Sequence, residues 1–405
     1  MEIIHERVCG LDVHKKTITA CILATKTKEI RTFGTMTEDL FQLIDWIKAS
    51  NCTIVAMEST GVYWKPIYNL LEVEEIETLV VNAQHIKNVP GRKSDVRDAQ
   101  WIAQLLRHGL VRGSYIPNRD QRELRELVRY RRSLVEEITR ESNRVQKVLE
   151  GANIKLGSVA SDVLGVSGRR MLKAIVDGET DPTKLADLSL KKLRNKIPEL
   201  QKALKGLLGP HQRFLLRKQL DHIEYLEFQV TQLDTEVANR FHSFEEDLEL
   251  LASIPGVGRR TAEHVLAEIG TDMTRFKDAK HLVSWAGLAP GQNESAGKRK
   301  TENTRKGNKY LRSSLAESAK VCAKTKTFLG TKYHRIAARR GKNRATIAVA
   351  ANILKIMFHL LTTRKPYTEL GEDFQLNRKK EIEKTRAIKK LEKLGFKIEI
   401  LDPPA

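Results

Sequence analysis

Residues 8–23 read VCGLDVHKKTITACIL, two apolar runs separated by a polar break at His14–Lys16. The pattern predicts two strands joined by a short turn. A third strand is expected over Glu29–Thr35, and a helix over Thr37–Ser50 with Thr37 as its N-cap.

Strand and helix patterns continue to alternate through the first third of the chain. Thr53–Met57 is a short apolar run that fits a buried strand, and Val62–Leu71 has the pattern of a helix. A further strand is expected over Ile76–Val81 and a further helix over Ser94–His108. The order of three strands, helix, strand, helix, strand and helix predicts a mixed sheet flanked by helices.

Four acids lie where such a sheet places functional groups. Asp12 falls inside the first apolar strand, where an unpaired carboxylate is costly. Glu58 follows the fourth strand, at the end where open α/β sheets have their sites. Asp95 and Asp98 are three residues apart at a helix start. Converging carboxylates need a divalent cation to neutralise them, and oxygen-only ligands suit Mg²⁺ or Mn²⁺. The structural alternative makes Asp95 a cap partner and pairs Asp98 with a neighbouring arginine.

Composition indicates the kind of partner. The 405 residues predict two or three domains, and a net charge of +20 with a pI of about 9.7 points to nucleic acid or an anionic surface. The longest apolar run, Ala345–Leu361, is interrupted by Asn352, Lys355 and His359 and so predicts a buried helix rather than a membrane span. The N-terminus lacks a signal pattern, which favours a cytoplasmic protein. Four cysteines without a CxxC pair make a zinc site or disulfide framework unexpected.

The middle of the chain has two long helical patterns. Asn118–Glu150 has apolar residues at heptad spacing and ends at Gly151, but Arg131 and Glu141 occupy two of the seam positions. That imperfect seam predicts limited helix pairing. The second pattern covers Pro210–Arg240, and the two helices can pair within one chain or between protomers.

The stretch 285–312 reads WAGLAPGQNESAGKRKTENTRKGNKYLR. Turn residues around Ser295 predict an exposed loop, and a serine among cations suits an encounter with a phosphodiester. A basic loop that only holds backbone phosphates is the alternative. Ser313 and Ser314 follow on a helical pattern and are expected to pack or cap. The candidate phosphate-holding residues are Lys298, Arg299, Lys300, Arg305, Lys306, Lys309 and Arg312.

Upstream of that loop, residues 254–258 read IPGVG between two apolar helical runs. The pattern is typical of a helix-hairpin-helix, in which Gly256 and Gly258 leave backbone N–H groups free for a phosphate. A plain loop between two helices is the alternative.

Two sets of motifs resemble a known family. GLDVHK at 10–15, AMESTGVYW at 56–64 and KSDVRDA at 93–99 are similar to the RuvC-like, RNase H-like domain of the Asp-Glu-Asp-Asp insertion-sequence transposases of the IS110 family. IPGVG, SWAGLAPG, NESAGKRK and TRKGNKYLR follow the order of that family's C-terminal transposase domain. The resemblance implies that Asp12, Glu58, Asp95 and Asp98 form a metal-binding tetrad and that Ser295 is the nucleophile. It also implies a non-coding bridge RNA that pairs with donor and target DNA.

We therefore expect an α/β RNase H-like domain over residues 1–117 and a long-helix, coiled-coil-like region over 118–245. A mainly α-helical transposase domain is expected over 246–365 and a charged tail over 366–405. The expected function is cutting and rejoining of double-stranded DNA by a homo-oligomer in which Ser295 of one protomer meets the tetrad of another. The alternatives are a metal-dependent nuclease or junction resolvase acting through water, and a non-catalytic nucleic-acid-binding protein.

Overall fold

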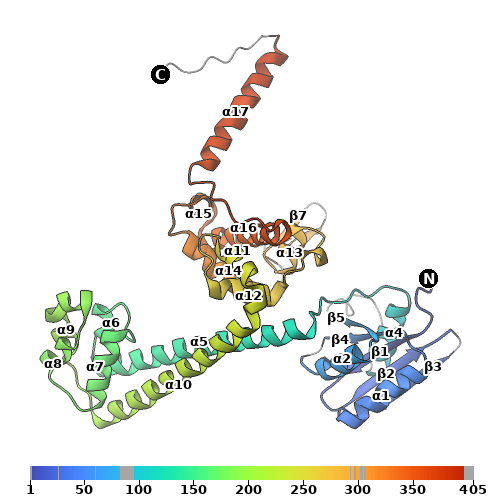
Figure 1. Cartoon of the computed structure of the whole chain (residues 1–405), viewed down its shortest axis with the longest axis horizontal. Helices are drawn as coiled ribbons and strands as arrows, with labels where there is room; N and C mark the ends of the chain where they lie inside the picture. The colour runs from blue at the N-terminus through green and yellow to red at the C-terminus, as the bar shows by residue number, and fades with distance from the viewer. Residues whose placement is uncertain are drawn as a thin grey trace. The chain divides into compact units, whose positions relative to one another are not determined.

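The structure is a computed structural model that describes residues 2–25, 27–59, 61–82, 95–291, 293–295, 298–301, 304 and 307–395. The chain forms two compact units, Met1–Pro117 and Asn118–Ala405. Figure 1 gives the labels of their elements.

The first unit contains a five-stranded mixed sheet, which confirms the predicted order of elements. Neighbouring strands follow the order β3-β2-β1-β4-β5, antiparallel among the first three and parallel from β1 to β5. The strands are β1 Val8–Val13, β2 Ile18–Leu23, β3 Lys28–Phe33, β4 Ile54–Glu58 and β5 Glu77–Val81. The helices are α1 Thr37–Ala49, α2 Trp64–Val73 and α4 Asp95–Arg107.

The two faces of the sheet pack against different helices. Cys9, Leu11 and Val13 of β1 belong to the apolar cluster that includes buried residues of α1 and α2. Val8 belongs to a second cluster, with α4. Because side chains alternate along a strand, Gly10 and Asp12 face the α4 side.

The predicted N-cap of α1 was wrong by one residue. The helix begins at Thr37, and Met36 is its N-cap. The backbone N–H of Met36 donates to the Asp39 carboxylate at 3.2 Å. An acid at the third helical position thus satisfies the cap backbone, and no hydroxyl is needed at the cap itself.

The second unit is built on two long helices, α5 Arg119–Gly151 and α10 Pro210–Phe241, which lie side by side in Figure 1. Glu123 pairs with Arg240 at 3.0 Å, and Arg131 pairs with Asp234 at 2.9 Å, so the helices run antiparallel. The structure therefore places the pairing within one chain. The expectation of limited pairing between the two long helices was wrong, because Arg131 of α5 forms an ion pair with Asp234 of α10 across the seam.

Short helices cover the end of this pair that is distant from α12. A shared apolar cluster joins them to both long helices. Pro182 and Pro198 stand in the first turns of helices, where proline is favoured. The elements are α6 Leu156–Val159, α7 Val166–Val176, α8 Pro182–Asp187, η1 Lys191–Lys196 and α9 Ile197–Ala203.

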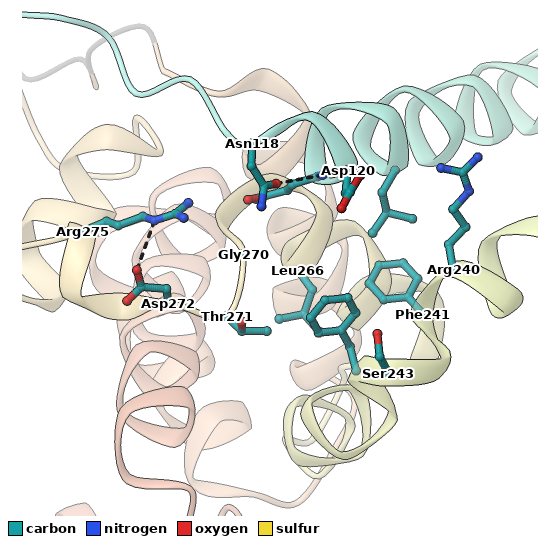
Figure 2. A pocket seen from close by; sticks show the side chains of 13 residues that line it. Asn118, Asp120, Arg240, Phe241, Ser243, Leu266, Gly270, Thr271, Asp272 and Arg275 are labelled. Atoms are coloured by element: carbon teal, nitrogen blue, oxygen red, sulfur yellow. Dashed lines mark hydrogen bonds and ion pairs between the residues drawn. The ribbon is translucent and has the colours of Figure 1, made fainter. Parts of the chain in front are cut away.

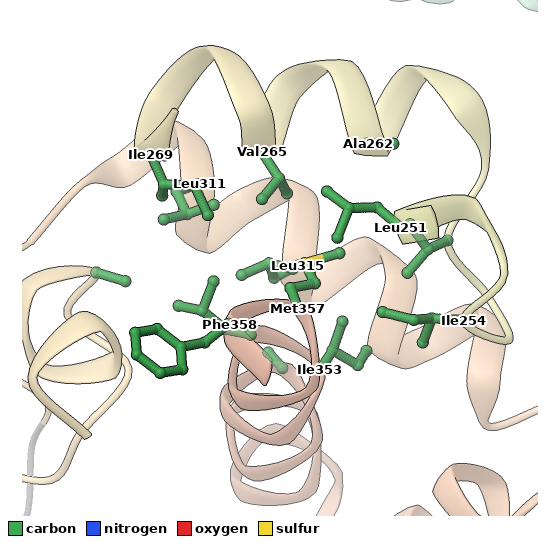
Figure 3. Close-up of a cluster of buried hydrophobic side chains, with 14 of the residues drawn as sticks. Leu251, Ile254, Ala262, Val265, Ile269, Leu311, Leu315, Ile353, Met357 and Phe358 are labelled. Carbon is green, nitrogen blue, oxygen red and sulfur yellow. The ribbon is translucent and has the colours of Figure 1, made fainter. Parts of the chain in front are cut away.

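The remaining body of the unit packs around one buried helix, α16 Lys342–Thr363. Figure 3 shows Ile353, Met357 and Phe358 of this helix beneath Leu311 and Leu315. By length and composition α16 passes for a membrane span, but ten of its residues are buried in this core. The prediction of a buried helix is confirmed.

The other elements of this body surround α16 or extend from it. They are η2 His242–Phe244, α11 Glu245–Ala252, α12 Arg259–Ile269, η3 Met273–Arg275, α13 Ala279–Trp285, β6 Asn293–Ser295, β7 Lys298–Thr301, α14 Lys309–Cys322, α15 Phe328–Arg340 and α17 Phe374–Lys393. Most of the described side chains of α17, in the charged tail, are exposed.

Ion pairs join α5 to α12. Arg131, only 3% exposed, donates to the buried carboxylate of Glu263 at 2.7 Å. Nearby on α5, Arg129 makes two bonds to the Glu268 carboxylate, at 2.7 and 2.8 Å. Arg125 donates to the backbone carbonyl of Glu268 at 2.6 Å. We call Arg125, Arg129, Arg131, Glu263 and Glu268 the α5–α12 clamp.

Removing one member of the buried pair leaves a charge without its partner. We expect Arg131→Leu or Glu263→Leu alone to lower the free energy of unfolding by about 3–5 kcal/mol. The double variant should lose less than the sum, because neither charge then remains buried and unpaired. Urea unfolding of all four proteins measures this, and strictly additive losses would contradict the clamp.

Candidate active site

Three of the four predicted carboxylates lie on one side of the first unit's sheet. Leu11 of β1 is in parallel register with Met57 of β4, so Asp12 and Glu58 are the next residues on neighbouring strands. Ile54 and Ala56 of β4 belong to the cluster under α4, and alternation places Glu58 on that side too.

A glycine lets the third carboxylate approach. A Cβ on Gly10 would lie 2.3 Å from the carbonyl oxygen of Ala99 and 2.5 Å from the nitrogen of Ala103. The backbones of β1 and α4 are therefore in direct contact, which only glycine permits at this position. Asp98 precedes Ala99 on α4, so this contact brings it toward Asp12.

The electrostatics of Asp12 reflect these neighbours. Its side chain is buried, and that burial raises its pKa most strongly. The negative charges of Asp98 and Glu58 raise the pKa further, while His14 lowers it. The His14 Nε2 lies 3.1 Å from Asp12 Oδ2. Asp98 and Glu58 are thus each close enough to Asp12 to act on its charge.

The candidate donor atoms of this group are carboxylate oxygens, which are the type of atom that a hard divalent cation prefers. Among the residues that the structure describes, no three acidic, histidine or cysteine side chains close around one metal position. Asp95 is the first residue of α4, and its side chain lies outside the described part of the chain. The carboxylates therefore suit a divalent cation by the chemistry and the charge of their oxygen atoms.

Ser295 belongs to the second unit, where it ends β6. The strand pairs with β7 in antiparallel register, with Ser295 opposite Lys298 and Glu294 opposite Arg299. The predicted loop is thus a two-stranded hairpin, and its strands of three and four residues are too short for a periodic pattern to reveal. The side chains of Ser295, Lys298, Arg299 and Lys300 lie outside the described part, as do Arg305 and Lys306 altogether.

Both roots of this hairpin are fixed to the body. Pro290 and Thr304 form an antiparallel bridge. A Cβ on Gly307 would lie 2.3 Å from the nitrogen of Gly287, so the two segments touch there. Asn308 caps α14 by accepting from two backbone N–H groups, and its amide donates to Glu268 of the clamp at 2.5 Å. The clamp therefore reaches the hairpin's second root.

The remaining predicted residues have different surroundings. Lys309 is exposed and Arg312 half-buried at the start of α14, where two of the backbone N–H groups already donate to Asn308 and the two cations remain as candidate anion contacts. Gly256, at φ +80°, packs against Cys322 of α14, whereas Gly258 caps α12 with open space around it. Their contact with phosphate stays a prediction.

Ser313 and Ser314 of α14 pack against the rest of the unit, as expected. Ser314 is buried, and Arg132 of α5 donates to the hydroxyl oxygens of Ser313 and Ser314 at 2.7 and 2.8 Å. These contacts tie α14 to α5 and occupy both side chains.

Sequence reasoning missed a second group of cations. Residues 318–368 contain twelve Lys or Arg and no Asp or Glu. Arg339, Arg340 and Lys342 are exposed where α15 gives way to α16. The pKa of Lys332 is lowered, mainly by burial and further by Arg335 and Lys355. The absence of Asp and Glu from residues 318–368 is the sequence signal that would have revealed these cations.

A cavity of about 410 Å³ lies elsewhere in the second unit, at the start of α5 and the ends of α10 and α12. Figure 2 shows Phe241 and Leu266 within it and the Arg275–Asp272 ion pair at its edge. None of the predicted site residues whose side chains the structure describes lines this cavity.

A mixed sheet with converging carboxylates is consistent with the RNase H-like class of nucleic-acid enzymes. A family model described as "Transposase" matches residues 9–154, and one described as "Transposase IS116/IS110/IS902 family" matches residues 248–335. The chain belongs to the IS110 family of transposases.

Named relatives extend along most of the chain. It is 24% identical over 378 residues to a pilin gene-inverting protein of Moraxella bovis, covering 88% of this chain and 96% of the relative. It is 25% identical over 369 residues to the transposase for insertion sequence element IS1111A of Coxiella burnetii, covering 89% and 91%. A probable family 20 transposase of Pseudomonas aeruginosa is 24% identical over 334 residues, covering 80% and 89%.

The repulsion at Asp12 gives a prediction for stability. Without divalent cations, Asp12→Asn should raise the melting temperature by about 2–4 °C, because a buried charge beside Glu58 and Asp98 is removed. Mg²⁺ should raise the melting temperature of the parent protein, and the same variant should lose most of that increase. Calorimetry with and without Mg²⁺ measures both effects. Asp45→Asn, an exposed acid of α1, is the matched control and should change neither.

Proposed function

We propose that this transposase cuts and rejoins DNA through a covalent serine intermediate. The observation that carries the proposal is the group of carboxylates on one sheet face, where burial, and then the charges of Asp98 and Glu58, raise the pKa of Asp12. A hairpin that pairs the serine strand β6 with the basic strand β7, and that is rooted on the helical body, would supply the second half of the chemistry.

In the proposed reaction each phosphorus–oxygen bond that breaks is replaced by a new phosphorus–oxygen bond. The Oγ of Ser295 forms a bond to a DNA phosphorus, loses its proton, and displaces a DNA hydroxyl oxygen that takes up a proton. A hydroxyl of another strand later attacks the phosphoserine and releases Ser295. Asp12, Glu58, Asp95 and Asp98 would hold Mg²⁺ or Mn²⁺, which supplies positive charge for the phosphoryl oxygens and lowers the pKa of a bound hydroxyl.

The proposed partners follow from charge and from the relatives. Gene inversion and insertion-sequence transposition, which the relatives' names state, both require exchange of DNA strands. Donor and target duplexes would lie against the cations of the hairpin and of the α15–α16 turn. A bridge RNA that selects both duplexes by base pairing would leave the protein to hold backbones. A homo-oligomer would supply several Ser295 nucleophiles, each meeting the tetrad of another protomer.

The rival function is a metal-dependent nuclease or junction resolvase. It is favoured by the first unit, which holds all four predicted acids but not Ser295. Such an enzyme would release DNA ends by water attack and leave no covalent adduct.

The covalent step is tested with labelled DNA. Reacted wild-type protein should yield a protease-sensitive protein–DNA adduct on denaturing gels. Ser295→Ala and Asp12→Ala should each abolish it, whereas the control Ser313→Ala should retain it. Cleavage without any adduct, or an adduct that survives Ser295→Ala, would favour the rival function.

The second group of cations is tested through salt. The affinity of wild-type protein for duplex DNA should fall steeply between low and physiological salt. Replacing Arg339, Arg340 and Lys342 by Ala should reduce the slope of log affinity against log salt by about 2–3, since each lost phosphate contact removes about 0.7–0.9. The exposed Lys147 of α5 is the matched control, and Lys147→Ala should leave the slope unchanged. An unchanged slope in the triple variant would exclude these residues from the DNA-binding surface.

A further inference from the structure

The carboxylate of Glu268 is the point where three helices meet. Glu268 lies on α12, is only 2% exposed, and accepts from residues of both α5 and α14. Arg129 of α5 donates to its two oxygens at 2.7 and 2.8 Å, and the Nε of Arg125 lies 3.3 Å from Oε2. The amide of Asn308, the N-cap of α14, donates to Oε2 at 2.5 Å. Both long side chains of α5 and the start of α14 are thus held by one buried acid.

Asn308 uses both ends of its side-chain amide, which determines how the amide is oriented. Its Oδ1 accepts from the backbone N–H groups of Tyr310 and Leu311, each at 3.1 Å, and so caps α14. A reversed amide would lose both capping bonds and present an acceptor to the Glu268 carboxylate. Arg129 contacts the same turn, because its guanidinium carbon lies 4.3 Å from the centre of the Tyr310 ring.

The residues before Asn308 lead directly into the serine hairpin. A Cβ on Gly307 would lie 2.3 Å from the nitrogen of Gly287, so the two roots of the hairpin are in backbone contact. The antiparallel bridge at Thr304 joins the roots a second time. β7 precedes this bridge and pairs with β6, which ends at Ser295. An isolated pair of short strands is only marginally stable, so the direction of this hairpin depends on its roots.

Stability alone does not account for the contacts of Glu268. A buried ion pair adds little net stability, because the loss of hydration offsets most of the attraction between the charges. The Arg131–Glu263 pair already joins α5 to α12, so Glu268 is not needed for that connection. What a carboxylate with several donors provides is one geometry, because each donor has to stay within hydrogen-bond distance.

We propose that Glu268 is a positioning residue for the serine nucleophile, and that it acts through the amide of Asn308. The carboxylate holds Asn308, Asn308 holds the start of α14 and the second root of the hairpin, and the root sets where Ser295 lies. A misplacement of about 1 Å near the reacting atoms can slow a reaction about a hundredfold. This inference rests on the proposed function, because it takes Ser295 as the nucleophile.

An exchange of donor and acceptor tests the contact and keeps the cap of α14. Asn308→Asp retains a capping oxygen but replaces the amide donor by a second carboxylate beside Glu268. The rate of covalent adduct formation at saturating DNA should fall about tenfold or more, while duplex affinity stays nearly unchanged. Adding Glu268→Gln restores one donor, one acceptor and the total charge of the pair. The double variant should therefore recover most of the lost rate.

Glu263→Gln is the matched control, because Glu263 is a buried acid of the same clamp and bonds Arg131 and Arg259 instead. It should lower the melting temperature but leave the rate of adduct formation unchanged at a temperature where every variant is folded. An equal loss of rate in this control would reduce Glu268 to a stabilising role and overturn the proposal. An Asn308→Asp protein that reacts like wild type, or a double variant that recovers nothing, would also overturn it.

Limited proteolysis reads the hold on the hairpin without any chemistry on DNA. Trypsin cuts after Lys and Arg, which occur five times within residues 298–306. Asn308→Asp should speed cutting there about fivefold relative to cutting in α17, and the double variant should restore the wild-type ratio. If wild type forms no adduct, the proposed function fails, and the proteolysis still decides whether Glu268 and Asn308 hold the hairpin. The same ratio in all variants would show that they do not.

Discussion

The second unit depends on charges that are buried between α5 and α12. Arg131 and Glu263 are both nearly inaccessible, and Arg129 holds the Glu268 carboxylate with both of its bonds. Buried ions tolerate little displacement, because each needs its partner at hydrogen-bond distance. The clamp therefore fixes the angle at which the helical arm leaves the body. Through Asn308 it also fixes the start of α14 and one root of the serine hairpin.

The first unit depends instead on a direct backbone contact, which is possible because Gly10 has no side chain. Gly10 allows the backbone of α4 to touch β1, and the carboxylates of Asp12 and Asp98 come within electrostatic reach as a result. Burial raises the pKa of Asp12 most strongly, and the charges of Asp98 and Glu58 raise it further. A carboxyl group with a pKa perturbed by burial and by neighbouring charges is a common feature of functional sites.

The two units thus contribute different parts of the proposed chemistry. One collects negative charge that suits a metal, and the other presents a serine among positive charges that suit a DNA backbone. The arm joins the body that carries the serine at Glu268, whose buried carboxylate accepts from Arg129 of α5 and from Asn308 at the start of α14.

The sequence by itself determined the order of strands and helices, the family, and the helical ranges of the arm. These follow from local periodicity and from short motifs, which a linear pattern records. Tertiary structure alone decided that α5 pairs with α10 of the same chain, because Arg131 and Glu141 look like seam defects until their partners are known. It also decided that Ser295 stands in a strand pair, since hydrogen bonds between two very short strands leave no periodic trace. Finally, it brought Asn308 to Glu268, because a contact between residues 40 apart in the chain leaves no pattern in either segment.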